Sequence, residues 1–283
     1  MSRRAREVAD APPPDAGRAK PLRLAVVGAT GRMGRRVAAL AAEAGVEVVG
    51  GVADLQRSEE EARAAGYPRI VAPEHAAGLI EGADVVLDFS SPKALAEVLD
   101  LAEEALAGRA LVVGTTGLGA AQERRLDDVA RSTAVLVAAN FSVGVNLLLS
   151  VAERMAAALP AAAYDVEIVE AHHRAKVDAP SGTALALAAA VARGRGVPLE
   201  GLRRDGRSGA AGPRPEGEIG IHALRGGSVA GEHRLHFLGG RERIELAHTA
   251  SDRDLFAEGA LLACRWARGR PPGRYGMRDV LDL

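Results

Sequence analysis

The sequence predicts an α/β protein that opens with a doubly wound parallel sheet and continues into a region with three alternating, strand-like segments. Two observations lead to the sheet. Short apolar runs alternate with helical patterns between residues 22 and 139, and the first run enters a glycine-rich turn. The later region rests on residues 218–225, 231–238 and 243–248, where polar and apolar side chains alternate as in antiparallel strands.

Composition narrows the class of protein before any motif is considered. With 283 residues, 48% hydrophobic and 26% charged, the chain can bury one large core or two modest ones. Its net charge of −1 gives no field that would recruit nucleic acid or an anionic membrane, and no apolar run approaches the ~20 residues of a membrane helix. Cys264, the single cysteine, excludes an intrachain disulfide and a cysteine-based metal cluster. We therefore expect a cytoplasmic protein with no metal, nucleic-acid or membrane partner.

The first 20 residues differ in composition from the rest of the chain. Arginine and proline are frequent there, and bulky apolar side chains are almost absent. Such a segment cannot bury enough apolar surface to order itself, and it has no continuous apolar stretch of the kind found in a secretion signal. Residues 1–20 are therefore predicted to form a disordered tail.

A strand, a glycine turn and a helix follow in direct succession. Residues 22–29 form an apolar run typical of a buried parallel strand, GATGRMG occupies 28–34, and a helical pattern continues to about residue 44. Such glycines allow a tight turn and the close approach of a pyrophosphate to a helix N-terminus. After a second predicted strand at 46–52, Asp54 lies where an acidic residue would bind the ribose of a dinucleotide. The alternative is a glycine-rich turn in an unrelated α/β protein.

The alternation of strands and helices continues to residue 139. Strands are predicted at 83–90, 110–113 and 134–139, with helices at 93–107 and 119–131. Ligands bind beyond the carboxyl ends of the strands in such sheets. The uncommon residues of the chain gather at these ends: Thr30, Phe89, Thr115, Thr116, Asn140, Phe141 and Asn146. Ordinary turn chemistry explains each of them separately, but it explains their gathering less well.

The most informative stretch is EAHHRAKVDAPSGT at 170–183, which leads into a predicted helix at 184–193. Ser181 is placed to cap that helix. The N–H groups of Gly182 and Thr183 would then be free at the helix end, where the helix dipole also favours an anion. The stretch therefore indicates a binding site for a small carboxylate. The plain alternative is an ordinary helix cap.

Proton donors lie in the same stretch. His172, His173 and Lys176 add positive charge and transferable protons a few residues before the helix end. Only three of the 36 lysine and arginine residues are lysines, so a lysine kept beside the histidines suggests that a compact ammonium is needed there. The alternative is that these are surface residues.

The remaining elements complete the predicted order. A helix is expected at 145–158 and a strand at 166–172, which delivers the histidines. Residues 194–217, rich in glycine, arginine and proline, form either a mobile lid or a solvated connection. After the three alternating segments, an amphipathic helix is expected at 255–267, and residues 275–283 close the chain.

Taken together, these motifs resemble the 4-hydroxy-tetrahydrodipicolinate reductase (dihydrodipicolinate reductase) family. The resemblance covers about residues 22–283. It rests on VGATGRMG at 27–34, DFS at 88–90, GTTG at 114–117, ANFSVGVN at 139–146, the 170–183 stretch, FAEGA at 256–260 and MRDVL at 277–281. The 170–183 stretch is the most specific of these motifs.

The resemblance implies a Rossmann-type domain at 21–142, completed by 253–283, and a substrate-binding and tetramerisation domain on a mixed sheet at 143–252. It implies hydride transfer from NADH or NADPH to an unsaturated, nitrogen-containing ring with two carboxylates, in lysine and diaminopimelate biosynthesis. The partners expected are this small dicarboxylate substrate and identical subunits of a homotetramer.

The resemblance also assigns roles to individual residues. His172 takes the place of the general acid, Lys176 that of a second proton donor, and His173, Ser181, Gly182 and Thr183 those of substrate contacts. The cofactor residues implied are Gly28, Ala29, Thr30, Gly31, Arg32, Met33, Asp54, Gly114, Thr115, Thr116, Ala138, Ala139, Asn140 and Phe141. The chain departs from some members at Leu55, where they have an arginine after the ribose acid. The stretch from 54 to 83 also looks short for the family, and we expect that only surface loops are missing from it.

Two rival functions are considered. Another two-domain dehydrogenase acting on an amino or keto acid is disfavoured, because the 170–183 stretch joined to the glycine turn points to the reductase family. A non-catalytic dinucleotide sensor with the same fold is disfavoured by the complete set of His172, His173 and Lys176. Oxidation of NADH by freshly generated hydroxy-tetrahydrodipicolinate distinguishes all three.

Overall fold

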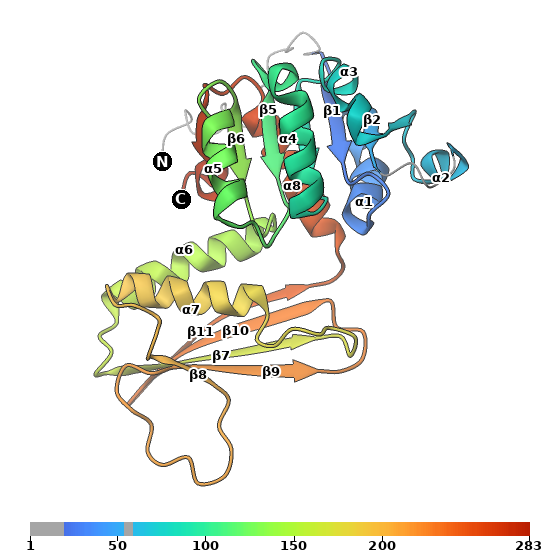
Figure 1. The fold of residues 1–283 in the computed structure, drawn as a ribbon. Helices are drawn as coiled ribbons and strands as arrows, with labels where there is room; N and C mark the ends of the chain where they lie inside the picture. The colour runs from blue at the N-terminus through green and yellow to red at the C-terminus, as the bar shows by residue number, and fades with distance from the viewer. Residues whose placement is uncertain (1–19, 54–58) are drawn as a thin grey trace, which may run out of the picture.

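The computed structural model describes residues 20–53 and 59–283, which form two sheets with helices packed on them (Figure 1). Apart from Lys20, the predicted disordered tail lies outside the described residues, and so do Asp54 and Leu55. Among the helices that the structure describes, none is both long and apolar enough to cross a membrane.

The first sheet has seven strands, all parallel, in the order β12-β6-β5-β4-β1-β2-β3. Its strands are β1 (Leu22–Val27), β2 (Val46–Val52), β3 (Ile70–Val71), β4 (Val85–Asp88), β5 (Ala110–Val113), β6 (Ala134–Val137) and β12 (Gly273–Tyr275). This is the predicted doubly wound parallel sheet. β3 and β12 were not predicted, because edge strands of two and three residues carry too few side chains to show a pattern.

Helices cover both faces of this sheet, so its central strands β4 and β5 are buried on both sides. On one face lie α1 (Arg32–Ala41) and α8 (Asp254–Ala267), and on the other lie α3 (Ala76–Ile80), α4 (Pro92–Leu106) and α5 (Ala120–Val129). Shorter pieces are α2 (Glu59–Ala64), the 3-10 turn η2 (Pro73–His75) and α9 (Met277–Leu281).

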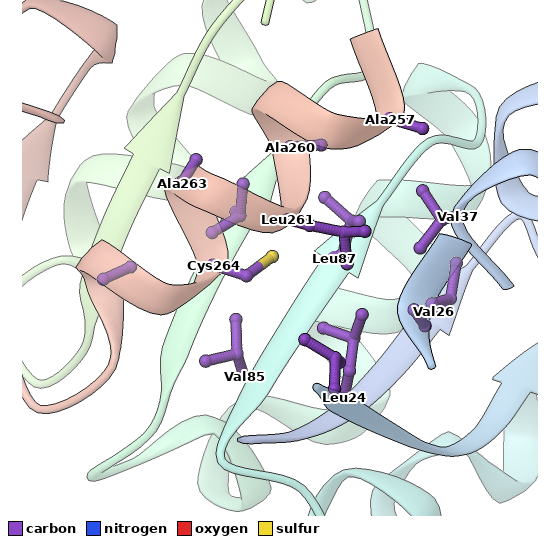
Figure 2. Packing of buried hydrophobic residues seen from close by; sticks show 14 of the residues in the cluster. Leu24, Val26, Val37, Val85, Leu87, Ala257, Ala260, Leu261, Ala263 and Cys264 are labelled. Carbon is purple, nitrogen blue, oxygen red and sulfur yellow. The ribbon is translucent and has the colours of Figure 1, made fainter. Parts of the chain in front are cut away.

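Helix α8 brings the end of the chain back onto the first sheet. Figure 2 shows Leu261 and Cys264 of this helix packed towards Leu87 and Val85 of β4. The thiol of Cys264 is fully buried, and burial raises its pKa. The single cysteine is therefore a small core residue.

The second sheet is mixed, with strand order β11-β10-β7-β9-β8. Its strands are β7 (Tyr164–His172), β8 (Arg203–Asp205), β9 (Ile219–Arg225), β10 (Gly231–Gly239) and β11 (Arg243–Ala250). β10 is antiparallel to β7 and β11, as predicted, but β9 pairs in parallel with β7 and β8. The expectation of three antiparallel strands was therefore wrong for β9. α7 lies between β7 and β9 in the chain, and such a helical crossover allows the two strands to pair in parallel.

Two long helices, α6 (Val143–Ala158) and α7 (Gly182–Gly194), cover one face of this sheet (Figure 1). Alternate residues of the strands point towards them, as shown by Val166 and Ile168 of β7, which are fully buried. On the opposite face, no helix of the described residues covers the strands (Figure 1).

The segment 194–217, considered above as a lid or a connection, contains β8 and is fastened to β7 by two arginines. Arg207 donates to both carboxylate oxygens of Glu167 (2.8 and 3.0 Å). Arg214 donates to Glu167 (3.0 Å) and to Asp165 (2.6 Å). These ion pairs hold the segment against the uncovered side of the sheet.

Candidate active site

The described residues enclose a cavity of about 890 Å³ where the carboxyl ends of the parallel strands meet α7 and the end of β7. From the first sheet it is lined by the predicted cofactor residues Arg32, Met33, Thr116, Ala138, Ala139 and Asn140. From the second it is lined by the predicted substrate and catalytic residues His172, His173, Lys176, Ser181, Gly182 and Thr183. Residues predicted from distant parts of the chain thus surround one cavity.

The glycine turn between β1 and α1 has the backbone that its motif predicts. Gly28 has a φ of +80°, and a Cβ there would collide with the carbonyl oxygen of Phe89. Its N–H donates to the carbonyl of Val52 (2.9 Å). α1 begins at Arg32 without a side-chain cap, and Arg32 and Met33 line the cavity. This open helix end can receive an anion such as a pyrophosphate.

Other predicted cofactor residues that the structure describes are not part of the cavity lining. Ala29 is buried, Thr30 is half-buried and Gly31 is exposed. Thr115 is buried, and its hydroxyl accepts a hydrogen bond from the Ser90 N–H (2.9 Å).

Two further predicted residues, Gly114 and Phe141, pack around the ring of Phe89. A Cβ on Gly114 would collide with that ring. The ring of Phe141 is buried edge-on to Phe89, with the two centroids 5.5 Å apart. Any contact of Phe141 with a ligand in the cavity would therefore use its backbone.

The start of α7 has the cap and the free N–H groups that the sequence predicted. The Ser181 hydroxyl caps the helix by accepting from the Ala184 N–H (3.2 Å). No described residue accepts a hydrogen bond from the N–H of Gly182 or Thr183, and both residues line the cavity. The side-chain amide of Asn140 donates to the Thr183 hydroxyl (3.2 Å) and so joins this helix end to the first sheet. The arrangement favours a carboxylate.

His172, at the end of β7, is held by a buried carboxylate. Its Nδ1 lies 2.6 Å from Oε2 of Glu170. Glu170 is fully buried, and it also accepts from Arg225 and from the backbone N–H of Ser181. Because Nδ1 faces an acceptor, Nε2 is the ring nitrogen left for proton transfer.

A second imidazole, His233 of β10, packs against His172 with ring centroids 5.2 Å apart. Its Nε2 lies 3.1 Å from the Ser181 hydroxyl. Burial, together with the nearby positive charge of His172, lowers the pKa of His233 to about 4. The ring is therefore neutral at physiological pH.

Lys176 and His173 bring an ammonium and an imidazole to the cavity. The Lys176 ammonium is bound by both carboxylate oxygens of Asp178 at 2.8 Å, and a hydrogen bond from this lysine lowers the Asp178 pKa. Nε2 of His173 lies 3.3 Å from the guanidinium of Arg253, which precedes α8. Both groups are placed to contact an anionic ligand.

Sequence reasoning missed several residues of this site: Arg225, Gly231, His233, Arg253, Phe256 and the tail residues 276–279. Arg225 and His233 belong to strands whose pairing with β7 brings them beside Glu170. The correct strand register would have located them, since His233 is the direct partner of Glu170 in that pairing.

Comparison with known proteins agrees with this arrangement. Residues 22–141 match the family model for the N-terminus of dihydrodipicolinate reductase, and residues 144–281 match the model for its C-terminus. The 4-hydroxy-tetrahydrodipicolinate reductase of Caulobacter vibrioides is 43% identical over 93% of this chain and 98% of its own. The enzyme of the same name from Rubrobacter xylanophilus is 47% identical over 92% of this chain and 98% of its own.

Solved structures give the same result. A dipicolinate-bound dihydrodipicolinate reductase from Paenisporosarcina sp. TG-14 superposes with a TM-score of 0.72 at 26% identity, over 91% of this chain and 98% of that one. A probable dehydrogenase from Thermotoga maritima, at a TM-score of 0.57 and 12% identity, covering 92% of both chains, shares the fold alone. The two family models together span almost all of the described residues, and the relatives named above match more than nine tenths of the chain. The chain belongs to the dihydrodipicolinate reductase family.

Proposed function

We propose that the cavity is the active site in which this chain carries out the reaction of its family. The activity is that of a 4-hydroxy-tetrahydrodipicolinate reductase in lysine and diaminopimelate biosynthesis, with NADH or NADPH as the hydride donor. The product is tetrahydrodipicolinate, formed from the dehydrated form of the substrate. The observation that carries the proposal is that His172 and the open end of α7 line the same cavity as the open end of α1.

The dicarboxylate is held by the start of α7. The N–H groups of Gly182 and Thr183 bind one carboxylate, with Ser181 fixing the helix end as its cap. Lys176 and His173, which line the same cavity, also bind the substrate. Support comes from the dipicolinate that the Paenisporosarcina enzyme binds, a flat ring with two carboxylates. Holding the ring at fixed points replaces a chance encounter with a defined orientation.

His172 is the general acid. Hydride addition to a conjugated ring leaves negative charge on it, and a nearby acid must neutralise that charge by protonation. Nε2 of His172 delivers the proton, because Nδ1 is engaged by Glu170. Lys176 is a second proton donor beside the same ring, and its ammonium donates hydrogen bonds to Asp178.

The residues at the first sheet fit a dinucleotide. The glycine turn at 28–34 and the uncapped start of α1 would hold the pyrophosphate, and Asp54, outside the described residues, would bind the adenosine ribose. Thr116, Ala138, Ala139 and Asn140 would face the nicotinamide. The reduced nicotinamide supplies the hydride when bound.

We also propose a homotetramer built from the residues of 143–252, in a cytoplasmic enzyme whose first domain comprises 21–142 and 253–283. The uncovered face of the second sheet supports this assembly. Leu224 of β9 and Leu238 of β10 are 58% and 36% exposed there, on the face that α6 and α7 leave free. Association would bury these side chains. Sedimentation equilibrium tests the assembly, and a monomer at micromolar concentration would refute it.

The reaction is tested by following the loss of reduced-nicotinamide absorbance with freshly generated hydroxy-tetrahydrodipicolinate. Turnover with this substrate, and its absence with amino and keto acids, is the expected result. Turnover only with an amino or keto acid would establish a different dehydrogenase. Tight NADH binding without turnover on any of these compounds would establish a dinucleotide sensor.

A further inference from the structure

Glu170 is a fully buried carboxylate that accepts hydrogen bonds from four donors. Oε2 faces Nδ1 of His172 (2.6 Å) and one nitrogen of Arg225 (2.8 Å). Oε1 accepts from the Ser181 N–H (3.0 Å) and from the other terminal nitrogen of Arg225 (2.8 Å). One side chain thus touches the end of β7, the start of α7 and the end of β9.

We propose that Glu170, gripped by Arg225, is a positioning residue that fixes His172 in register with the carboxylate-binding end of α7. Its two oxygens divide the work. One sets the orientation of the His172 ring, and the other holds the backbone of Ser181, from which the helix end projects. The distance between proton donor and bound carboxylate is then set by a single rigid group. The proposal rests on the role of His172 as the general acid.

The ionic state of Glu170 suits this task. Burial alone would raise its pKa, but hydrogen bonds from Arg225, His172 and the Ser181 N–H bring it below its ordinary value. The carboxylate is therefore ionised and can only accept, which requires a proton on Nδ1 of His172. That requirement leaves Nε2 as the nitrogen that exchanges a proton with the ring in the cavity.

The other ring beside His172 does not compete with Glu170 as a charged partner. His233 packs against its ring and is neutral, and the Ser181 hydroxyl lies 3.1 Å from Nε2 of His233. The neighbouring ring on β10, that of His233, is thus neutral. Among the described residues, the one charged hydrogen-bond partner of His172 is Glu170.

Arg225 also connects Glu170 to the segment that carries Lys176 and Asp178. Besides its two bonds to Glu170, it donates to the backbone carbonyl of Asp178 (2.6 Å). Asp178 in turn binds the ammonium of Lys176. A bidentate guanidinium–carboxylate pair is planar and directional, so it can align these pieces where a lysine could not.

A double-mutant cycle tests the proposal. Glu170→Gln keeps the shape of the side chain but removes its charge and one of its acceptors. We expect it to lower kcat at least about tenfold, as for other partners that orient a catalytic histidine. In a His172→Gln background the same substitution should change kcat less than about twofold. NADH affinity should be unchanged in every variant.

The split between kcat and binding separates positioning from a purely structural role. If Glu170 only supported the fold, Glu170→Gln would lower kcat by the same factor in the wild-type and His172→Gln backgrounds. It would also weaken the binding of pyridine-2,6-dicarboxylate by as large a factor as it lowers kcat. That result would overturn the proposal. Glu103→Gln removes another arginine-bound glutamate far from the cavity, bonded to Arg125 at 2.7 Å, and should change nothing.

Arg225→Lys is the second variant, for use if Glu170→Gln does not fold. Lysine retains the positive charge but cannot donate from two terminal nitrogens to both oxygens of Glu170. We expect a smaller loss of kcat than for Glu170→Gln, and we expect it to vanish in the His172→Gln background. An equal loss in both backgrounds overturns the proposal. Near-normal turnover of His172→Gln alone would instead refute the acid role on which the proposal rests, so the two failures are distinguishable.

Discussion

Gly231, the first residue of β10, lies against the ring nitrogen from which His172 would donate its proton. A Cβ built on Gly231 would be 3.2 Å from Nε2 of His172. A side chain at this position would therefore press on Nε2, the nitrogen assigned to proton transfer.

Gly231→Ala should therefore lower kcat about three- to tenfold, since a displacement well under 1 Å is enough to misplace a catalytic group. The variant should fold and bind NADH as the wild type does. Gly240→Ala is the matched control: Gly240 directly follows the same strand, and a Cβ there would meet nothing within 4 Å. Equal kinetics of the two variants would show that space beside Nε2 is not needed.

Lys176→Arg should reduce turnover about tenfold, although both side chains are cationic. A guanidinium keeps its proton at any accessible pH and cannot match the geometry of an ammonium held by Asp178. Lys93→Arg is the control, because Lys93 is exposed on α4, where it pairs with Glu97. Unchanged kcat and KM for Lys176→Arg would refute the need for an ammonium.

NADH should serve at least as well as NADPH. Asp54 can accept hydrogen bonds from a ribose diol, whereas it would repel a 2′-phosphate, and Leu55 offers no cation in compensation. The measurement is the ratio of kcat/KM for the two cofactors at low and high salt. A ratio above about ten in favour of NADPH at both salts would show that nearby arginines such as Arg32 decide the choice. Leu55→Arg should move the ratio towards NADPH.

Acid should unfold the protein partly through Glu167. Burial alone would raise the pKa of this carboxyl, but hydrogen bonds from Arg207, His222 and Arg214 hold it at about 2, below its ordinary 4.5. Between these values the unfolded chain binds a proton that the folded chain does not, so stability falls as the pH falls.

The expected slope from this single group is at most about 1.4 kcal/mol per pH unit. Urea unfolding at pH 5, 4 and 3 should show a smaller loss of stability for Glu167→Gln than for the wild type, starting from a less stable protein at pH 5. Glu97→Gln, an exposed glutamate paired with Lys93, is the control. Parallel pH dependences of the Glu167 variant and the wild type would contradict the account.

The parts of the fold that were predictable from the sequence are those whose side chains share one environment. β5 begins and ends where predicted, because a strand buried on both faces is a continuous apolar run. β2 also has the predicted bounds, although Glu47 within it is exposed. The parallel pairing of β9 was not predictable in the same way. Its alternating pattern fits either direction, and the choice depends on the crossover through α7 rather than on the strand itself.

The candidate site divides in the same manner. Local motifs located the glycine turn, the helix cap at Ser181 and the histidine pair. The Glu170–Arg225 contact joins residues 55 positions apart, so no spacing within a motif indicates it. The family resemblance assigned Phe141 to the cofactor, and the structure places its ring in the core.

The most direct test of the account is the turnover of His172→Gln, measured with freshly generated substrate beside His75→Gln, an exposed histidine outside the cavity. We expect His172→Gln to fold and to bind NADH normally, while kcat falls about 10²-fold or more, the usual effect of losing a general acid. His75→Gln should match the wild type. Wild-type turnover by His172→Gln would contradict the central claim that this histidine protonates the reduced ring.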